Sequence, residues 1–140
     1  MKILLAADGS SYTKKALAFL VANENLQDAL AEVLVFHVQA PLTRNVVKHI
    51  GSEVAADYYS DNAKKVLQPI ETFLTKRGIP YRTAWTVGVA SDEILKAARK
   101  QKAHLIVMGT HGRGLAGRIL LGSVAQRVLA ESDVPVLLVK

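Results

Sequence analysis

Glycines crowd one short stretch of the chain, and their spacing suits the binding of an anion. Four fall within nine residues: Gly109, Gly112, Gly114 and Gly117. The apolar run 104–108 before them predicts a strand, and the spacing of apolar residues in 120–129 predicts an amphipathic helix after them. With few Cβ atoms in the way, backbone N–H groups can close on an anion, and the helix N-terminus adds a positive dipole end. The expected ligand is a phosphate chain.

Two common phosphate-binding motifs fit this loop poorly. Gly109 and Gly114 have the first glycine spacing of a Walker A loop, but Leu115-Ala116 stands where Lys and then Ser or Thr are required. Residues 112–117 match the dinucleotide fingerprint, which belongs in the first βα turn and needs an acidic residue about twenty positions later, at a strand end. Residues 118–140 place no acid in that position. A nicotinamide or flavin dinucleotide site is therefore disfavoured.

Asp8 is the other residue whose type and position could do chemistry. It follows the apolar run that starts at Lys2 and precedes a helical pattern that Ser10 or Ser11 would cap. This places Asp8 at the carboxyl end of a strand, where open α/β sheets bind ligands. The residues alone leave two roles open for Asp8, contact with a ligand or stabilisation of the turn.

Catalytic groups are sparse. Asp8 and His111 are the only candidates for activating a water beside a phosphate, and neither lies in a recognisable catalytic constellation. Ser10 could be imagined with them as a triad, but it lacks a Gly-x-Ser-x-Gly elbow and is better explained as a helix cap. The four histidines show no paired ligand spacing, so we propose no histidine metal site, and His37 is expected to be a packed or edge residue.

Composition favours a soluble, cytoplasmic protein of one domain, residues 1–140. There is no cysteine, no leader-like N-terminal region and no apolar run long enough to span a bilayer. Lysine and arginine exceed the acids by 18 to 12, giving a net charge of +6 that suits an anionic ligand or, non-specifically, nucleic acid. The basic stretch 96–102 carries no interleaved aromatic residues, which favours a solvated face over a specific nucleic-acid site.

Apolar runs and helical patterns alternate along the chain, which predicts an α/β fold. Four helical regions separate the expected strands, which lie near 2–8, 31–38, 81–87, 104–109 and 134–139. Because such crossovers are right-handed and join parallel strands, we expect a doubly wound, Rossmann-like five-stranded parallel sheet with helices on both faces. Residues 40–60 are the hardest to interpret. Gly51 and Pro69 interrupt the helical pattern around 54–76, which predicts one bent helix or two short ones.

A third phosphate pattern, Gly109-x2-Gly112-x9-Gly122-Ser123, fits the chain better. On these residues the sequence closely resembles the universal stress protein family, in its ATP-binding subgroup. The likeness covers essentially the whole chain, because further segments fall in the family's order: 3–10, His37-Val38, 106–113 and 120–125. Ala6 is one departure, since some ATP-binding relatives carry proline there, and it affects only the fine fit near adenine.

The resemblance implies a strand order of 3-2-1-4-5 and a set of binding residues. Adenine and ribose would be surrounded by Asp8, Val38, Met108 and Gly109. The phosphates would be held through backbone N–H groups and the Ser123 hydroxyl by Gly112, Gly122, Ser123 and Val124. Taken alone, Met108 is better explained by core packing and Ser123 by helix capping, and their joint spacing is what favours a binding role. Mg²⁺ would be held only through the phosphates. The C-terminal strand 134–139 would form an apolar edge, so we expect a homodimer through it.

The function expected from this resemblance is an ATP-binding stress-response sensor or regulator. It would hold ATP at the carboxyl ends of the strands, with slow hydrolysis at most. Two alternatives remain: a slow, metal-dependent ATPase or nucleotide-transferring enzyme, and a nucleotide-free dimeric interaction protein. The intact glycines argue against the second alternative.

Overall fold

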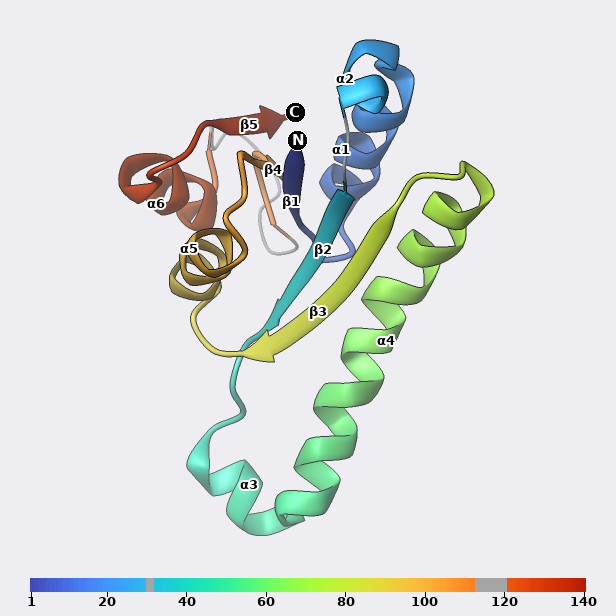
Figure 1. The fold of residues 1–140 in the computed structure, drawn as a ribbon. Coiled ribbons are helices and arrows are strands. Elements are labelled where there is room, and N and C mark those ends of the chain that lie inside the picture. The colour runs from blue at the N-terminus through green and yellow to red at the C-terminus, as the bar shows by residue number, and fades with distance from the viewer. Residues whose placement is uncertain (30–31, 113–120) are drawn as a thin grey trace.

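The computed structural model describes residues 1–29, 32–112 and 121–140, and these form one five-stranded parallel sheet. The strands are β1 (Lys2–Ala6), β2 (Glu32–Gln39), β3 (Tyr81–Val87), β4 (Leu105–Gly109) and β5 (Val136–Val139). Their order across the sheet is β3-β2-β1-β4-β5, and every neighbouring pair is parallel (Figure 1). The doubly wound α/β fold and the strand order 3-2-1-4-5 are therefore confirmed.

Alternate residues of the central strands feed two separate cores. In β1, Ile3 and Leu5 pack on one side of the sheet, and Leu4 packs on the other. All three are almost completely buried, as expected for a parallel strand covered on both faces. This double burial explains why β1 and β4 and most of β2 appear in the sequence as apolar runs rather than as alternating patterns.

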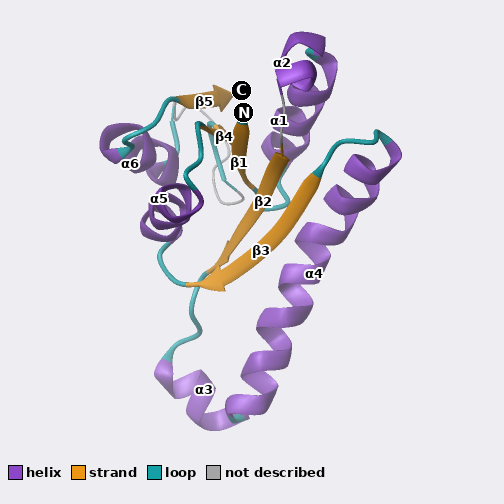
Figure 2. Ribbon diagram, viewed as in Figure 1, coloured by secondary structure: helices purple, strands orange, loops and turns teal. Residues whose placement is uncertain are grey.

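Helices cover both faces of the sheet (Figure 2). One face carries α1 (Ser11–Ala22) and α4 (Ser52–Lys76), with the short α2 (Glu24–Ala29) following α1. The opposite face carries α5 (Ala90–Gln101) and α6 (Ser123–Glu131). Ser10 caps α1, since its side chain accepts a hydrogen bond from the Thr13 N–H at 3.4 Å, which confirms the expected start of that helix.

The segment after β2 forms two helices that extend beyond the carboxyl end of β3 (Figure 1). The first, α3 (Arg44–Ile50), buries none of its residues. Gly51 then adopts a φ of +85°, a conformation that favours glycine, and separates α3 from α4. Of the two forms expected for 54–76, one bent helix or two short ones, the structure has a single helix, α4. The chain breaks at Gly51, and α4 continues through Pro69 because packing along its length outweighs the missing hydrogen bond.

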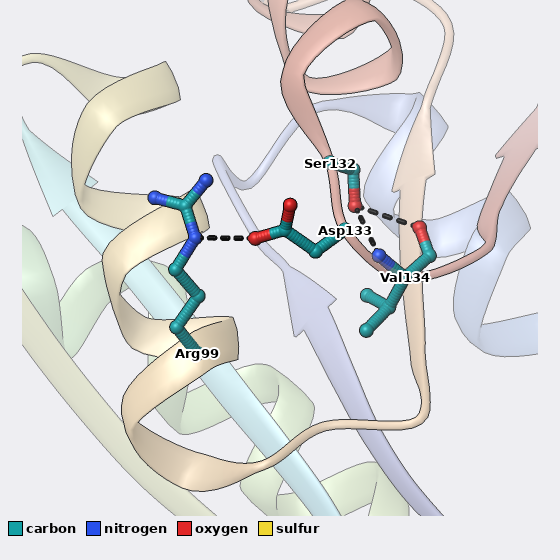
Figure 3. Close-up of polar contacts among 4 residues, drawn as sticks. All are labelled: Arg99, Ser132, Asp133 and Val134. Atoms are coloured by element: carbon teal, nitrogen blue, oxygen red, sulfur yellow. Dashed lines mark hydrogen bonds and ion pairs between the residues drawn. The ribbon is translucent and has the colours of Figure 1, made fainter.

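A polar turn leads into the edge strand β5. The Arg99 guanidinium on α5 lies 2.6 Å from the Asp133 carboxylate, and this hydrogen bond and charge raise the pKa of Arg99 (Figure 3). The Ser132 hydroxyl donates to the Val134 carbonyl at 2.7 Å and accepts from the Val134 N–H at 3.2 Å. These bonds fix the direction in which the chain enters β5.

No helix in the described ranges is long and apolar enough to cross a membrane.

Candidate functional site

A cavity of about 310 Å³ opens at the carboxyl ends of the central strands. It lies where β1 separates β2 from β4, the point at which strand order reverses and ligands bind in folds of this class. The starts of α5 and α6 contribute its remaining walls through Ala90, Ile94 and residues 122–125. The cavity is therefore formed by segments far apart in the sequence that the sheet topology brings together.

Asp8 lies just beyond β1 and is held in a small hydrogen-bond network. Its Oδ1 accepts from the Ser10 N–H and from the Thr13 hydroxyl, both at 2.9 Å. The Asp8 N–H in turn donates to the Thr13 hydroxyl oxygen at 3.2 Å. A Cβ atom placed on Gly112 would lie 3.2 Å from Oδ2, so the second carboxylate oxygen faces the glycine loop. Asp8 thus both stabilises its turn and presents an oxygen to the cavity.

Gly109 ends β4 at a position that excludes any side chain. A Cβ atom there would lie 2.3 Å from the Cβ of Tyr12 on α1, far inside van der Waals contact. The Tyr12 ring packs against the His111 ring, with centroids 5.1 Å apart. The hydroxyl of Thr110 forms a 2.9 Å hydrogen bond with Nδ1 of His111. The start of the glycine loop is therefore packed closely against the first turn of α1.

The N-terminus of α6 is directed to the same cavity. Gly122 is its N-cap and makes no side-chain capping bond, so Ser123 is the first helical residue rather than the cap. The Gly122 N–H already donates to the Thr110 carbonyl at 2.7 Å. The sequence pattern assigned the Gly122 N–H to phosphate. In the structure this N–H instead closes the loop through its bond to Thr110. The glycine, which lines the cavity without a side chain, leaves room beside Ser123 and Val124.

The opposite wall of the cavity is apolar. It includes Phe36 and Val38 of β2, Ile94 of α5 and Met108 of β4. Met108 is 5% exposed and belongs to the core on the α5–α6 side, so it packs in the core and lines the cavity at once. The cavity therefore has an apolar half and a half formed mainly by glycine and helix-start backbone. The apolar half suits a base, and the backbone half suits a phosphate chain.

All eight residues named from the sequence line this one cavity: Asp8, Val38, Met108, Gly109, Gly112, Gly122, Ser123 and Val124. Gly114, Gly117, Arg113 and Arg118 lie outside the described residues. Sequence reasoning missed Phe36, Ile94 and Ala90 as lining residues. The first two look like ordinary core positions in the sequence, and only the packing of α5 against β2 places them at the cavity.

Metal ligands are few around the cavity. Among the described residues, no cluster of three or more His, Asp or Glu side chains could hold a metal ion. His37 is 6% exposed and its Nδ1 donates to the Ala7 carbonyl at 2.7 Å, which confirms that it is a packed residue. Asp8 supplies a carboxylate at the cavity, and a divalent cation would need oxygen ligands from elsewhere, such as phosphate or water.

Comparison with known proteins decides the family. The model of the universal stress protein family matches residues 1–140. This chain belongs to the universal stress protein family. A universal stress protein of Thermus aquaticus is 38% identical over 143 residues, which cover 99% of this chain and 97% of the relative.

Solved structures of the universal stress protein family agree with the fold described above. MJ0577 of Methanocaldococcus jannaschii superposes with a TM-score of 0.83 at 31% identity, covering 99% of this chain and 94% of its own. The universal stress protein from Archaeoglobus fulgidus, solved in complex with dAMP, gives a TM-score of 0.68 at 24% identity and covers 100% and 98%. At that identity, the second likeness supports the fold alone.

Proposed function

We propose that this universal stress protein binds ATP in the cavity at the carboxyl ends of β1, β2 and β4 and acts as a stress-response sensor or regulator. The observation that carries the proposal is the single 310 Å³ cavity lined by all eight residues of the ATP-binding pattern. The dAMP complex of the Archaeoglobus fulgidus relative adds support, because it places an adenine nucleotide in a related fold.

The two halves of the cavity suggest how ATP would lie. Adenine would pack against the apolar wall at Val38 and Met108, and ribose would approach the free oxygen of Asp8. The phosphates would lie at the N-terminus of α6, where backbone N–H groups and the helix dipole favour negative charge. Mg²⁺ would be held mainly by the phosphates, since Asp8 is the one acidic side chain among the described residues that line the cavity.

We do not expect this protein to hydrolyse ATP rapidly. Phosphoryl transfer to water needs a group that positions the water as well as a site for the phosphates. Oδ1 of Asp8 is engaged by Ser10 and Thr13, and Nδ1 of His111 is engaged by Thr110. We therefore expect slow turnover at most, and a nucleotide-dependent change of conformation or partner as the output.

The edge strand β5 supports a homodimer as part of the same proposal. The carbonyls of Pro135 and Val139 accept hydrogen bonds from Ile106 and Thr110 on the β4 side. Since backbone groups alternate along a strand, the N–H and C=O groups of Val136 and Leu138 point to the open side of the edge. A second copy of the chain could extend the sheet there.

Nucleotide binding is tested first, by thermal unfolding of nucleotide-stripped protein with MgATP, AMP or NADH in separate samples. At one hundred times its dissociation constant, a ligand stabilises by about 2.7 kcal/mol, which for this size means roughly 5–10 °C. We expect the largest shift with MgATP. Gly122→Val should abolish that shift, and Ala130→Val on the exposed side of the same helix should keep it. Normal MgATP binding by Gly122→Val would contradict the phosphate assignment.

The dimer is tested separately, by the molar mass of the protein in solution. Leu138→Pro removes an N–H that the sheet does not use, so it should leave the monomer folded and abolish the dimer. Thermal unfolding with MgATP checks that this variant still folds. A folded Leu138→Pro variant with the mass of a dimer would contradict the proposed interface.

A further inference from the structure

A second hollow lies on the other face of the sheet, between α1 and α4. The two helices pack on different strands: α1 lies against β4 and β5, and α4 lies against β2 and β3 (Figure 1). The groove left between them has a volume of about 510 Å³. Its walls come from residues 9–18 on one side and 65–73 on the other. Both its volume and its mostly apolar lining are typical of small-molecule sites.

The floor of this α1–α4 groove is apolar and belongs to the domain core. Leu17, Val66 and Ile70 line it, and each is no more than 5% exposed. Pro69 and Phe73 continue the apolar wall along α4. Pro69 donates no backbone hydrogen bond, so this part of the wall offers little polar chemistry to a ligand. The surface suits a hydrocarbon chain better than a sugar or a peptide.

Two lysines line the α1–α4 groove, Lys14 from α1 and Lys65 from α4. Helices α1 and α4 both run antiparallel to the parallel strands that they cover, so they run in the same direction. Lys14 lies near the start of α1, and Lys65 precedes Pro69 and Phe73 on α4. The groove is thus cationic toward the carboxyl edge of the sheet and apolar toward its far end.

Neither lysine has its charge neutralised within the described part of the chain. Among residues 1–29, 32–112 and 121–140, none forms an ion pair with Lys14 or Lys65, and none that lines the groove is acidic. Arg77 lies outside the groove lining and over the Phe73 ring, with its Cζ 5.5 Å from the ring centroid. The charge of the groove therefore favours an anion.

We propose that the α1–α4 groove binds an amphipathic anion, a single hydrocarbon chain that ends in a carboxylate. The chain lies on Leu17, Val66 and Ile70 and extends toward Phe73, and the carboxylate meets Lys14 and Lys65. Removing the chain from water supplies most of the affinity, and the two ammonium groups select for the negative head group. This site does not depend on nucleotide in the first cavity, although Thr13 lines both hollows.

The test is calorimetric titration of the nucleotide-stripped protein with dodecanoate below its micelle concentration, compared with dodecanol and dodecyltrimethylammonium. We expect one dodecanoate per chain, bound at least tenfold more tightly than the neutral or cationic probe. The Lys14→Glu/Lys65→Glu double variant should weaken dodecanoate binding at least tenfold. Lys64→Glu is the matched control, because Lys64 is exposed on the same helix and does not line the groove.

A second variant tests whether the ligand occupies the space of the groove, independently of the charge of the lysines. Ala18 is exposed and lines the groove, so Ala18→Phe should block dodecanoate and leave the MgATP-induced melting shift unchanged. If the double charge reversal fails to fold, Lys14→Gln/Lys65→Gln replaces it in the same titration. The proposal is overturned if dodecanoate does not bind, if the three probes bind equally, or if Ala18→Phe binds dodecanoate as the parent protein does.

Discussion

The two hollows of this domain differ in the kind of atoms that form them. The proposed nucleotide cavity, the hollow of about 310 Å³ at the strand ends, lies where Gly109, Gly112 and Gly122 leave backbone and helix-start groups exposed to it. The α1–α4 groove lies between two regular helices, and side chains form its walls and its charged end. The glycine half of the first hollow is thus specified by the absence of side chains, and the second hollow by their presence.

This difference predicts opposite responses to substitution. Where loop backbone packs closely on a helix, as at Gly109, there is no space for an added methyl group, so this glycine affects folding as well as binding. A groove between helices can change its side chains at low cost, because the backbone hydrogen bonds remain within each helix.

Gly109→Ala should destabilise the protein most. The added Cβ would lie 2.3 Å from the Cβ of Tyr12, so β4 or α1 must shift. We expect a loss of about 3 kcal/mol in the free energy of unfolding, measured by chemical denaturation. Gly112→Ala is the control, because its Cβ would meet only Oδ2 of Asp8, at 3.2 Å, and should cost less than about 1 kcal/mol. Equal losses in the two variants would show that the crowding at Tyr12 relaxes easily.

Asp8→Ala should have the next largest effect. It removes the acceptor for the Ser10 N–H and the Thr13 hydroxyl, and we expect a loss of about 1–2 kcal/mol in unfolding free energy. Asp8→Asn keeps an acceptor oxygen at the same place and should recover most of that stability. The MgATP-induced melting shift should fall in both variants if the carboxylate also contacts the nucleotide. A full shift in Asp8→Asn would limit the role of Asp8 to the turn.

The α/β class and the parallel sheet follow from the residues alone, whereas the strand order and the eight cavity residues were implied by the resemblance to the universal stress protein family. Continuous apolar runs such as 3–7 and 33–36 predict buried parallel strands, and right-handed crossovers leave few ways to order them. The spacing of glycines after β4 then places the loop. The six-residue helix α2 was missed because it is too short to show a period.

Features that depend on contacts between distant segments could not be predicted. The bond from the Gly122 N–H to the Thr110 carbonyl depends on how the loop closes, which the motif does not encode. The α1–α4 groove depends on the spacing of two helices that settle on different strands, and its residues look like ordinary amphipathic positions in the sequence. Ile94 joins the nucleotide cavity only because α5 packs beside β2.

Ala18→Leu should change stability in the opposite direction from Gly109→Ala. Ala18 is exposed at the α1–α4 groove, so a larger apolar side chain can cover part of the apolar wall without displacing backbone. Leucine and alanine both favour helices, and the added burial should raise the free energy of unfolding by about 0.5 kcal/mol. Chemical denaturation measures the change. A loss above about 1 kcal/mol would show that the groove is as tightly constrained as the cavity.

Lys65→Gln should have the smallest effect on the empty protein. Lysine and glutamine have similar helix propensities, and Lys65 makes no ion pair with the described residues, so the unfolding free energy should change by less than about 0.5 kcal/mol. The MgATP-induced melting shift should also stay unchanged, because the lysine lies outside the nucleotide cavity. If Lys65→Gln costs more than about 1 kcal/mol, this lysine stabilises the fold. The position of Lys65 at the groove would then be explained without a ligand. The two hollows would differ only in the part that glycines play in the nucleotide cavity.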